Sequence, residues 1–309
     1  MHKPVLLNAV LQYLDPQPGQ KFVDATVSHG GHGFALWCSV QPGGQVLGIE
    51  WDSELADKLV KRAEHLGLKE GITVVNDSYT NLKKIAEQYD FNQVDGILFD
   101  LGLSSWHLDE SGRGFSFQKV EDLDMRFNRS TTLTAMEIIN TWPERELVRI
   151  IKDYGEEGFA EKIARGIVEV RQQGAITTTD GLVAAIEQAV PHWYQQRRLN
   201  PATKTFQALR LAVNSELENI EHGLEAALKI LNIDGRLAVI SFHSLEDKIV
   251  KTKFKEWEKA GVVVLLNKHV VKPDFSEVNA NPRARSAHLR IVKKVANERN
   301  ASLSSSETN

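Results

Sequence analysis

The sequence predicts an α/β protein with a parallel-type sheet that is interrupted by a helical insertion. Short apolar runs typical of buried strands alternate with amphipathic runs typical of helices through roughly the first hundred residues. The pattern becomes mainly helical after Ser104, and a strand-like run returns at Arg236. Strands that alternate with helices form parallel sheets with right-handed crossovers, and helices then cover both faces of the sheet.

The individual elements follow from hydrophobic periodicity and from cap signals. The expected strands cover residues 22–27, 72–75, 96–99 and 236–242, and residues 43–50 are expected to form a turn and a further strand. In the first part of the chain the expected helices cover 34–40 and 54–66, the second capped by Ser53. The later helices are expected at 135–140, 144–153, 159–170 and 180–189, followed by one long helical run at 206–231.

These elements predict two domains and a tail. The chain has 309 residues, more than one compact domain usually holds. We expect the core to comprise residues 1–105 and 206–296, with the helical insertion at residues 106–205. The polar, serine-rich tail at residues 297–309 is expected to be disordered.

Composition favours a soluble protein of the cytoplasm. The single cysteine, Cys38, cannot form an internal disulfide, so the chain carries no mark of an oxidising compartment. We expect no signal peptide and no membrane span, because no apolar run approaches the required length. The formal net charge is -4, so any binding to nucleic acid must come from local basic patches.

A glycine-rich loop after the first expected strand is the first candidate site. Asp24 precedes it, and the loop reads Ser28-His29-Gly30-Gly31-His32-Gly33. Glycines allow close approach of the backbone to a ligand, and free amides at a helix start can face that ligand. Glu50, at the end of the second strand, can bind both hydroxyls of an adenosine ribose. This spacing indicates a nucleoside site without naming the cofactor, and a simple tight turn remains the alternative.

Two further strand ends carry polar side chains. Asp100 follows the strand at 96–99, at the carboxyl edge where open α/β proteins place ligands. A carboxylate there can take a proton from a substrate amine, or it can merely form a turn. His243, after the last strand, can orient a substrate base or relay a proton, or it can be a structural histidine. The histidines lack the spacing of metal ligands, so we expect no metal.

Basic residues form local clusters in the second half of the chain. They are Arg197, Arg198, Lys204, Arg210, Arg283, Arg285 and Arg290. Guanidinium groups match phosphate oxygens, so these residues are candidate contacts to a nucleic acid, and solvated surface is the other interpretation.

Several motifs together resemble one family closely. They are His2-Lys-Pro-Val-Leu-Leu7, Asp24-Ala-Thr26, Gly30-Gly-His32, Asp95-Gly-Ile97, Asp100-Leu-Gly-Leu-Ser-Ser105, Arg113-Gly-Phe-Ser-Phe117, Leu123-Asp-Met-Arg126, Tyr154-Gly-Glu-Glu157, Thr205-Phe-Gln-Ala-Leu-Arg210, Ser241-Phe-His-Ser-Leu-Glu-Asp247 and Asn281-Pro-Arg-Ala-Arg-Ser286. In this order they resemble the bacterial small-subunit ribosomal RNA cytosine-N4 methyltransferases, the RsmH or MraW family. The resemblance covers residues 2 to about 292.

The resemblance implies a class I, Rossmann-like methyltransferase with an inserted helical domain. It implies S-adenosyl-L-methionine as the donor and N4 methylation of a cytidine in the decoding centre of 16S rRNA, within the small ribosomal subunit. The cofactor contacts that it implies are Gly30, Gly31, His32, Glu50, Tyr79, Asp100 and His107. We predict Asp100 and His243 as catalytic residues, and Lys204, Arg210, Arg283 and Arg285 as contacts to RNA. The oligomeric state and the identity of the catalytic base stay open.

The chain departs from the family pattern at several positions. Ser28-His29 stands where Gly-Arg is usual, Gly33 replaces a common serine, Glu50 a usual aspartate and Lys204 a usual arginine. An altered glycine loop leaves open a ribosome-assembly factor that has lost catalysis. A DNA amino-methyltransferase is a weaker alternative, because no Asp/Asn-Pro-Pro-aromatic motif occurs in the chain. A nicotinamide-dependent oxidoreductase is weaker still, because the loop is not the dinucleotide fingerprint.

Overall fold

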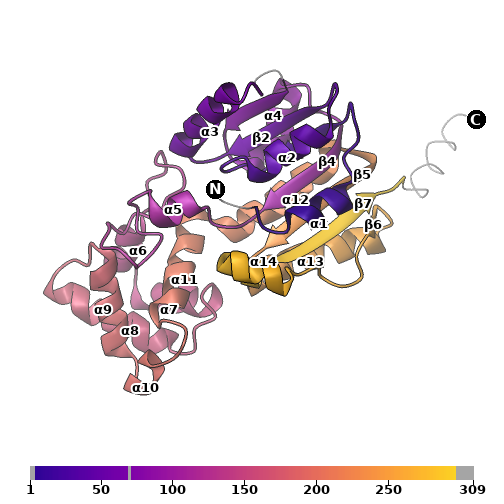
Figure 1. Cartoon of the computed structure of the whole chain (residues 1–309). Helices are drawn as coiled ribbons and strands as arrows, with labels where there is room; N and C mark the ends of the chain where they lie inside the picture. Colours follow the sequence, from indigo (N-terminus) through magenta and orange to yellow (C-terminus); the bar gives the residue numbers. More distant parts are fainter. Residues whose placement is uncertain (1–3, 69–70, 297–309) are drawn as a thin grey trace, which may run out of the picture. The chain divides into compact units, whose positions relative to one another are not determined.

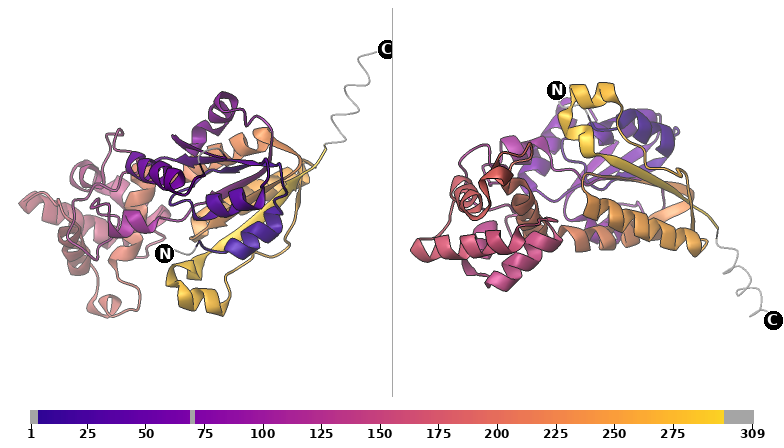
Figure 2. Two further views of the ribbon diagram at one scale, coloured as in Figure 1. Left: turned by 45° about the horizontal axis from the view of Figure 1, so that its top comes forward. Right: turned by 90° about the horizontal axis from the view of Figure 1, so that it is seen from below.

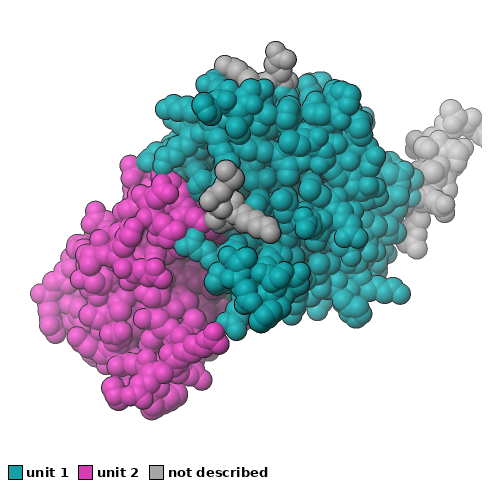
Figure 3. All heavy atoms as spheres, in the orientation of Figure 1, with its two compact units in different colours: residues 1–102, 217–309 teal, residues 103–216 magenta. Residues whose placement is uncertain are grey.

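The chain forms two compact units, seen in a computed structural model that describes residues 4–68 and 71–296. Unit 1 comprises residues 1–102 and 217–309, and unit 2 comprises residues 103–216 (Figure 3). The expected insertion ended at residue 205, whereas unit 2 continues to Glu216. The predicted disordered tail lies outside the described residues. No helix in the described part of the chain is long and apolar enough to cross a membrane.

Within the described residues, unit 1 is built on a seven-stranded sheet in the order β3-β2-β1-β4-β5-β7-β6 (Figure 1). The strands are β1 (Lys21–Asp24), β2 (Gln45–Glu50), β3 (Ile72–Asn76), β4 (Val94–Asp100), β5 (Leu231–Ser241), β6 (Val263–Leu265) and β7 (His288–Lys294). The first five strands pair in parallel, and β7 pairs antiparallel with both β5 and β6. The expected α/β class is therefore confirmed, and β6 and β7 were not predicted.

Helices cover both faces of this sheet (Figure 2). They are α1 (Leu7–Leu14), α2 (Gly31–Ser39), α3 (Ser53–His65), α4 (Leu82–Gln88), α12 (Glu216–Ile230), α13 (Ser244–Lys259) and α14 (Phe275–Ala280), with 3-10 turns η1 (Tyr79–Asn81) and η2 (Pro282–Ser286). Side chains of β4 alternate between two cores: Ile97 and Phe99 face one, and Leu98 faces the other. A strand buried on both sides is typical of a parallel sheet, so its sequence is continuously apolar.

Local geometry corrects three expectations. Strand β1 ends at Asp24 rather than at residue 27. The N-cap of α3 is Asp52 rather than Ser53, because the Asp52 carboxylate accepts the amide N–H of Glu54 at 2.9 Å. The single helical run expected at 206–231 is two helices, because Ser215 takes a left-handed conformation with φ 49° after α11 (Ala202–Asn214).

Unit 2 is a helical domain with its own core. Its helices are α5 (Ser105–Asp109), α6 (Ala135–Thr141), α7 (Glu144–Asp153), α8 (Ala160–Gln173), α9 (Thr179–Ala189), α10 (His192–Gln195) and α11. Apolar side chains of α6, α7, α8, α9 and α11 meet in one buried cluster, to which α7 contributes Leu147, Ile150 and Ile151. Helix α11 packs into this cluster through Phe206, Leu209 and Val213, which explains why it belongs to unit 2.

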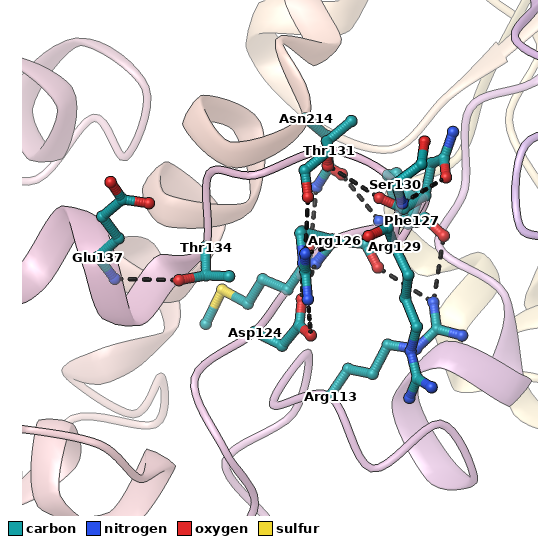
Figure 4. A network of polar contacts seen from close by, with 12 residues as sticks. Arg113, Asp124, Arg126, Phe127, Arg129, Ser130, Thr131, Thr134, Glu137 and Asn214 are labelled. Carbon is teal, nitrogen blue, oxygen red and sulfur yellow. Dashed lines mark hydrogen bonds and ion pairs between the residues drawn. The ribbon is translucent and has the colours of Figure 1, made fainter.

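Polar side chains, rather than regular structure, hold the segment before α6 (Figure 4). Arg126 forms a two-pronged ion pair with Asp124, at 2.6 and 2.8 Å, and Arg113 donates to the carbonyls of Arg126 and Phe127. Burial alone would raise the pKa of Asp124, but hydrogen bonds from Arg126 outweigh it and hold that pKa below its usual value. Buried Asn214 of α11 accepts the N–H of Phe127 and donates to the carbonyl of Met125.

We expect Asn214→Ala to lower the free energy of unfolding by about 2 to 4 kcal/mol, because buried backbone groups of Phe127 and Met125 lose their partners. Chemical denaturation measures this loss. Asn92→Ala, at an exposed position, is the control and should change the free energy by less than about 0.5 kcal/mol. Equal effects of the two substitutions would contradict the assigned role of Asn214.

Candidate active site

Three carboxylates gather at the carboxyl edge of the sheet in unit 1. Asp24 ends β1, Glu50 ends β2 and Asp100 ends β4, and these three strands are neighbours in parallel register. Asp24 is buried, with 1% of its surface exposed, whereas Glu50 and Asp100 are half-buried. The carboxyl ends of adjacent parallel strands meet at one edge, so the fold itself brings these acids together.

Burial, with smaller contributions from neighbouring charges, makes Asp24 and Glu50 hard to ionise. Burial raises the pKa of Asp24 to about 7, with further contributions from the charges of Asp100 and Glu50. Burial likewise raises the pKa of Glu50 to about 7. Backbone N–H groups oppose both shifts, among them that of Asp52, which donates to Glu50 at 2.8 Å. The carboxylates are therefore poised to gain from a positively charged ligand.

The glycine loop is shaped by the packing of the protein itself. Gly30 has φ 80°, and a Cβ there would lie 2.7 Å from Leu59 Cδ1. A Cβ on Gly31 would lie 2.5 Å from Pro4 Cγ, and Gly33 faces Val27 and Asp24. These neighbouring side chains already favour glycine at the three positions, so the glycines do not by themselves prove close approach of a ligand. The Gly33 amide, in the first turn of α2, donates to the Asp24 carboxylate.

His32 connects this edge to the N-terminal segment. The side chain is buried, and its Nε2 lies 2.9 Å from the carbonyl oxygen of Val5. A carbonyl oxygen can only accept, so Nε2 carries a proton. On the other side of the ring, Nδ1 lies 3.4 Å from Asp100 Oδ2. His32 therefore lies beside the acid that sequence reasoning placed at the reacting centre.

Tyr79 lies just after β3, in η1. Its ring packs edge-on against Phe99 of β4, with centroids 5.4 Å apart. A Cβ on Gly223 of α12 would lie 2.6 Å from this ring, so a glycine there makes room for the tyrosine. The contact of Tyr79 with an adenine stays a prediction.

His243 caps α13. Its Nδ1 accepts the amide N–H of Glu246 at 3.4 Å, and the Glu246 carboxylate accepts the N–H of His243 in return, which completes a capping box. The other ring nitrogen, Nε2, lies 2.9 Å from Glu246 Oε1. The backbone amide of buried Glu246 therefore contacts Nδ1, and its carboxylate lies beside Nε2. The structure thus shows a structural use of His243, and its catalytic role stays a prediction.

The remaining predicted residues lie at several places in the two units. His107 belongs to unit 2, where Ser104 Oγ lies 2.7 Å from its Nδ1 and Phe115 and Phe127 pack against its ring. Its contact with the cofactor stays a prediction. Lys204 Nζ donates to the Glu156 carbonyl at 2.6 Å.

The arginines differ in their surroundings. Arg210 forms an ion pair with Glu216 at 2.8 Å, and Arg290 pairs with Asp247 through two hydrogen bonds. Arg283 and Arg285 are exposed on η2. Their roles in RNA binding stay predictions, and for Arg210 an internal ion pair already occupies part of the guanidinium group.

Sequence reasoning singled out Asp24 at its strand end but did not include it among the site residues. It also missed Glu246, which organises the start of α13. The sequence signal for Asp24 was its place at the end of a strand. The signal for Glu246 was a His-x-x-Glu spacing at the start of a helix. Both residues are almost fully buried, which no local pattern reveals.

The raised pKa of Asp24 predicts a pH-dependent stability. In the folded protein Asp24 titrates at about pH 7, and in the unfolded chain near 3.8. The folded state therefore binds more protons between these pH values, so ionisation of Asp24 lowers the free energy of unfolding as pH rises through that window.

We expect Asp24→Asn to gain stability relative to the wild type as pH rises from about 4 to 7, by a few kcal/mol in total. Denaturant titrations at several pH values measure this difference, with exposed Asp57→Asn as the control. Parallel curves for wild type and Asp24→Asn would refute the shift.

Substitutions at His243 test its use as a cap. We expect His243→Ala to lower the free energy of unfolding by about 1 kcal/mol, because the Glu246 amide loses its acceptor. Asparagine is a good N-cap residue, so His243→Asn should lose less stability than His243→Ala, although it too lacks the ring nitrogen beside the Glu246 carboxylate. Thermal or denaturant unfolding reads both values, and an equal loss in the two variants would contradict the capping role.

Comparison with known proteins assigns the chain to a family. Residues 1–295 match the MraW methylase family. A protein of Dictyoglomus thermophilum named ribosomal RNA small subunit methyltransferase H is 41% identical over 292 residues, covering 94% of this chain and 96% of the relative. Proteins of the same name from Syntrophobacter fumaroxidans and Dehalococcoides mccartyi are 40% and 42% identical, each aligned over 95% of this chain and over 96% and 86% of their own lengths. The chain therefore belongs to the MraW methylase family, and S-adenosylmethionine is its methyl donor.

Proposed function

We propose that this protein transfers a methyl group from S-adenosylmethionine to the N4 atom of a cytidine in the decoding centre of small-subunit ribosomal RNA. The observation that carries the proposal is the set of three carboxylates at the carboxyl edge, Asp24, Glu50 and Asp100, in a member of a methylase family. The names of the relatives support small-subunit ribosomal RNA as the substrate.

The residues at this edge fit the donor. Its sulfonium group is positively charged, and burial, which raises the pKa values of Asp24 and Glu50 to about 7, means that a cation beside them would stabilise their ionised forms. Glu50 already accepts backbone amides of Asp52, Ser28 and Trp51, but a carboxylate has about four lone-pair positions, so it can still accept from a ribose hydroxyl. Tyr79, after the neighbouring strand β3, can lie against an adenine ring.

Asp100 is the acid that we place at the reacting amine. The exocyclic amine of cytosine is a weak nucleophile, because its lone pair is delocalised into the ring. A carboxylate that accepts one N–H of this amine localises the lone pair on nitrogen and takes up the proton that leaves. S-adenosylmethionine supplies an activated methyl group, so alignment of the acceptor provides much of the remaining rate enhancement. His32 is a protein neighbour of this acid, with its Nδ1 3.4 Å from Asp100 Oδ2.

We assign phosphate contacts to exposed and partly exposed cations. Arg283 and Arg285 are exposed, and Lys204, which is partly exposed, can exchange its hydrogen bond to the Glu156 carbonyl for one to a phosphate. Arg210 would have to leave Glu216 to make such a contact, so we expect it to contribute less. Because the chain has a net charge of -4, these local cations matter more than the overall field.

The direct test of function is mass spectrometry of small-subunit RNA from cells with and without the gene. We expect N4-methylcytidine at a decoding-centre position to disappear with the gene and to return when purified protein and S-adenosylmethionine are added to the deficient subunits. An unchanged level of this nucleoside, or methyl transfer to another atom, would refute the proposed specificity.

The role of Asp100 is tested separately. We expect Asp100→Asn to lower kcat by about 100-fold or more at saturating donor and RNA, because an amide cannot take the departing proton. Steady-state kinetics on methyl-deficient subunits measure this, with Asp57→Asn on the exposed face of α3 as the control. A change in KM for the donor alone, with kcat preserved, would limit Asp100 to cofactor binding.

A further inference from the structure

An exposed aromatic and basic surface on unit 2 is not used by the chemistry described above. Trp193 of α10 exposes 58% of its surface, although tryptophan is on average one of the more buried residue types. Phe159, just before α8, and Tyr194 pack against it, each with ring centroids 5.8 Å away. We call Phe159, Trp193, Tyr194 and Arg197 the aromatic platform.

Buried hydrogen bonds hold the base of this platform. The Tyr194 hydroxyl donates to the carboxylate of Glu157, with distances of 2.9 and 2.7 Å to its two oxygens, and Glu157 is 3% exposed. The same carboxylate accepts the amide N–H of Phe159 at 2.9 Å. Burial and the bond to Glu157 raise the pKa of Tyr194 to about 12, so the phenol stays a neutral donor. Two of the rings are thus fixed to one buried anchor.

The indole of Trp193 has edge-to-face neighbours. Its interplanar angles are 65° to Phe159 and 89° to Tyr194, so neither ring lies parallel to it. An exposed indole whose aromatic neighbours meet it edge-on offers a face on which a flat ring can stack. A nucleobase is such a ring, and every base has a face that stacks on an aromatic side chain.

Two cations lie beside the rings of the platform. The Arg197 guanidinium lies 5.9 Å from the Trp193 ring centroid and 5.1 Å from that of Tyr194, and Lys162 Nζ lies 5.5 Å from that of Phe159. From residue 188 to residue 215 the chain carries arginine and lysine but no aspartate or glutamate. Acids do stand next to Phe159 in the sequence, Glu156, Glu157 and Glu161, and of these Glu157 is buried. Aromatic rings flanked by cations are the arrangement that single-stranded nucleic acids require.

We propose that the aromatic platform binds an unpaired nucleotide of the substrate RNA, with the base stacked on Trp193 and its phosphate beside Arg197. This inference rests on the proposed function, since it assigns part of the RNA contact to unit 2. The arginines and lysines of residues 188–215, a stretch without aspartate or glutamate, favour RNA rather than a protein as the occupant. Double-stranded RNA hides the faces of its bases, so single strands or loops are the form that the platform recognises.

The test measures RNA affinity and catalysis of the full-length protein in parallel. Fluorescence anisotropy with a short unstructured RNA reports binding, and methyl transfer to methyl-deficient small subunits reports kcat and KM. We expect Trp193→Ala to weaken binding of the oligonucleotide roughly five- to a hundredfold, the range for loss of one stacked base. It should raise KM for subunits and leave kcat and the Kd for S-adenosylmethionine unchanged. Trp193→Phe, which keeps an aromatic face, should recover most of the affinity, and Arg197→Ala should reduce the salt dependence of binding.

Controls separate this inference from the proposed function. Tyr89→Ala removes an exposed aromatic ring of unit 1 and should bind RNA as the wild type does. Because Trp193 is mostly exposed, thermal unfolding of Trp193→Ala should match the wild type within a few degrees.

If the wild type methylates subunits but Trp193→Ala keeps its affinity for the oligonucleotide, the platform does not bind RNA. A raised KM for subunits with unchanged oligonucleotide affinity would indicate a protein contact instead and would overturn the proposal. Failure of the wild type to methylate subunits would instead refute the proposed function.

Discussion

The crowding of carboxylates at the carboxyl edge of the sheet is the constraint on which the site depends. A parallel sheet must bring the ends of β1, β2 and β4 together, and each of these strands ends in an acid. Backbone amides, rather than lysine or arginine, are the groups that lower the pKa values of two of these acids, Asp24 and Glu50. An internal cation would neutralise the edge permanently, whereas amides leave part of the charge for a ligand to satisfy.

Around this edge, side chains far apart in sequence keep the acids in place. The hydroxyl of Thr26, just after β1, accepts the amide N–H of Asp100 at 2.6 Å. The Val5 carbonyl oxygen accepts from His32 Nε2, and the amide N–H of Leu6 donates to the carboxylate of Glu277 in α14. The N-terminal segment therefore ties the glycine loop to the last part of unit 1. In unit 2, hydrogen bonds of Arg113, Arg126 and Asn214 hold the irregular segment that precedes α6.

Much of the fold was predictable because strand and helix periodicities are local. The strands that carry Asp24, Glu50 and Asp100 were placed from sequence, and the parallel arrangement followed from alternation of elements. Other features depend on tertiary packing. The break at Ser215 is one left-handed residue, and α11 belongs to unit 2 because Phe206 and Leu209 pack there. His243 was ambiguous, since a strand-to-helix junction suits a cap and a catalytic residue equally. Strand β6 has only three residues, too few for a periodic signal.

The most direct measurement is the number of protons released when S-adenosylmethionine binds at about pH 7, near the pKa values of Asp24 and Glu50. Isothermal titration calorimetry in buffers of different ionisation enthalpy gives this number. A cation that binds beside half-protonated acids lowers their pKa values, so we expect release of a substantial fraction of a proton. S-adenosylhomocysteine, whose sulfur is uncharged, should release less. Equal release for the two ligands, or none, would contradict the claim that these carboxylates hold the charge of the donor.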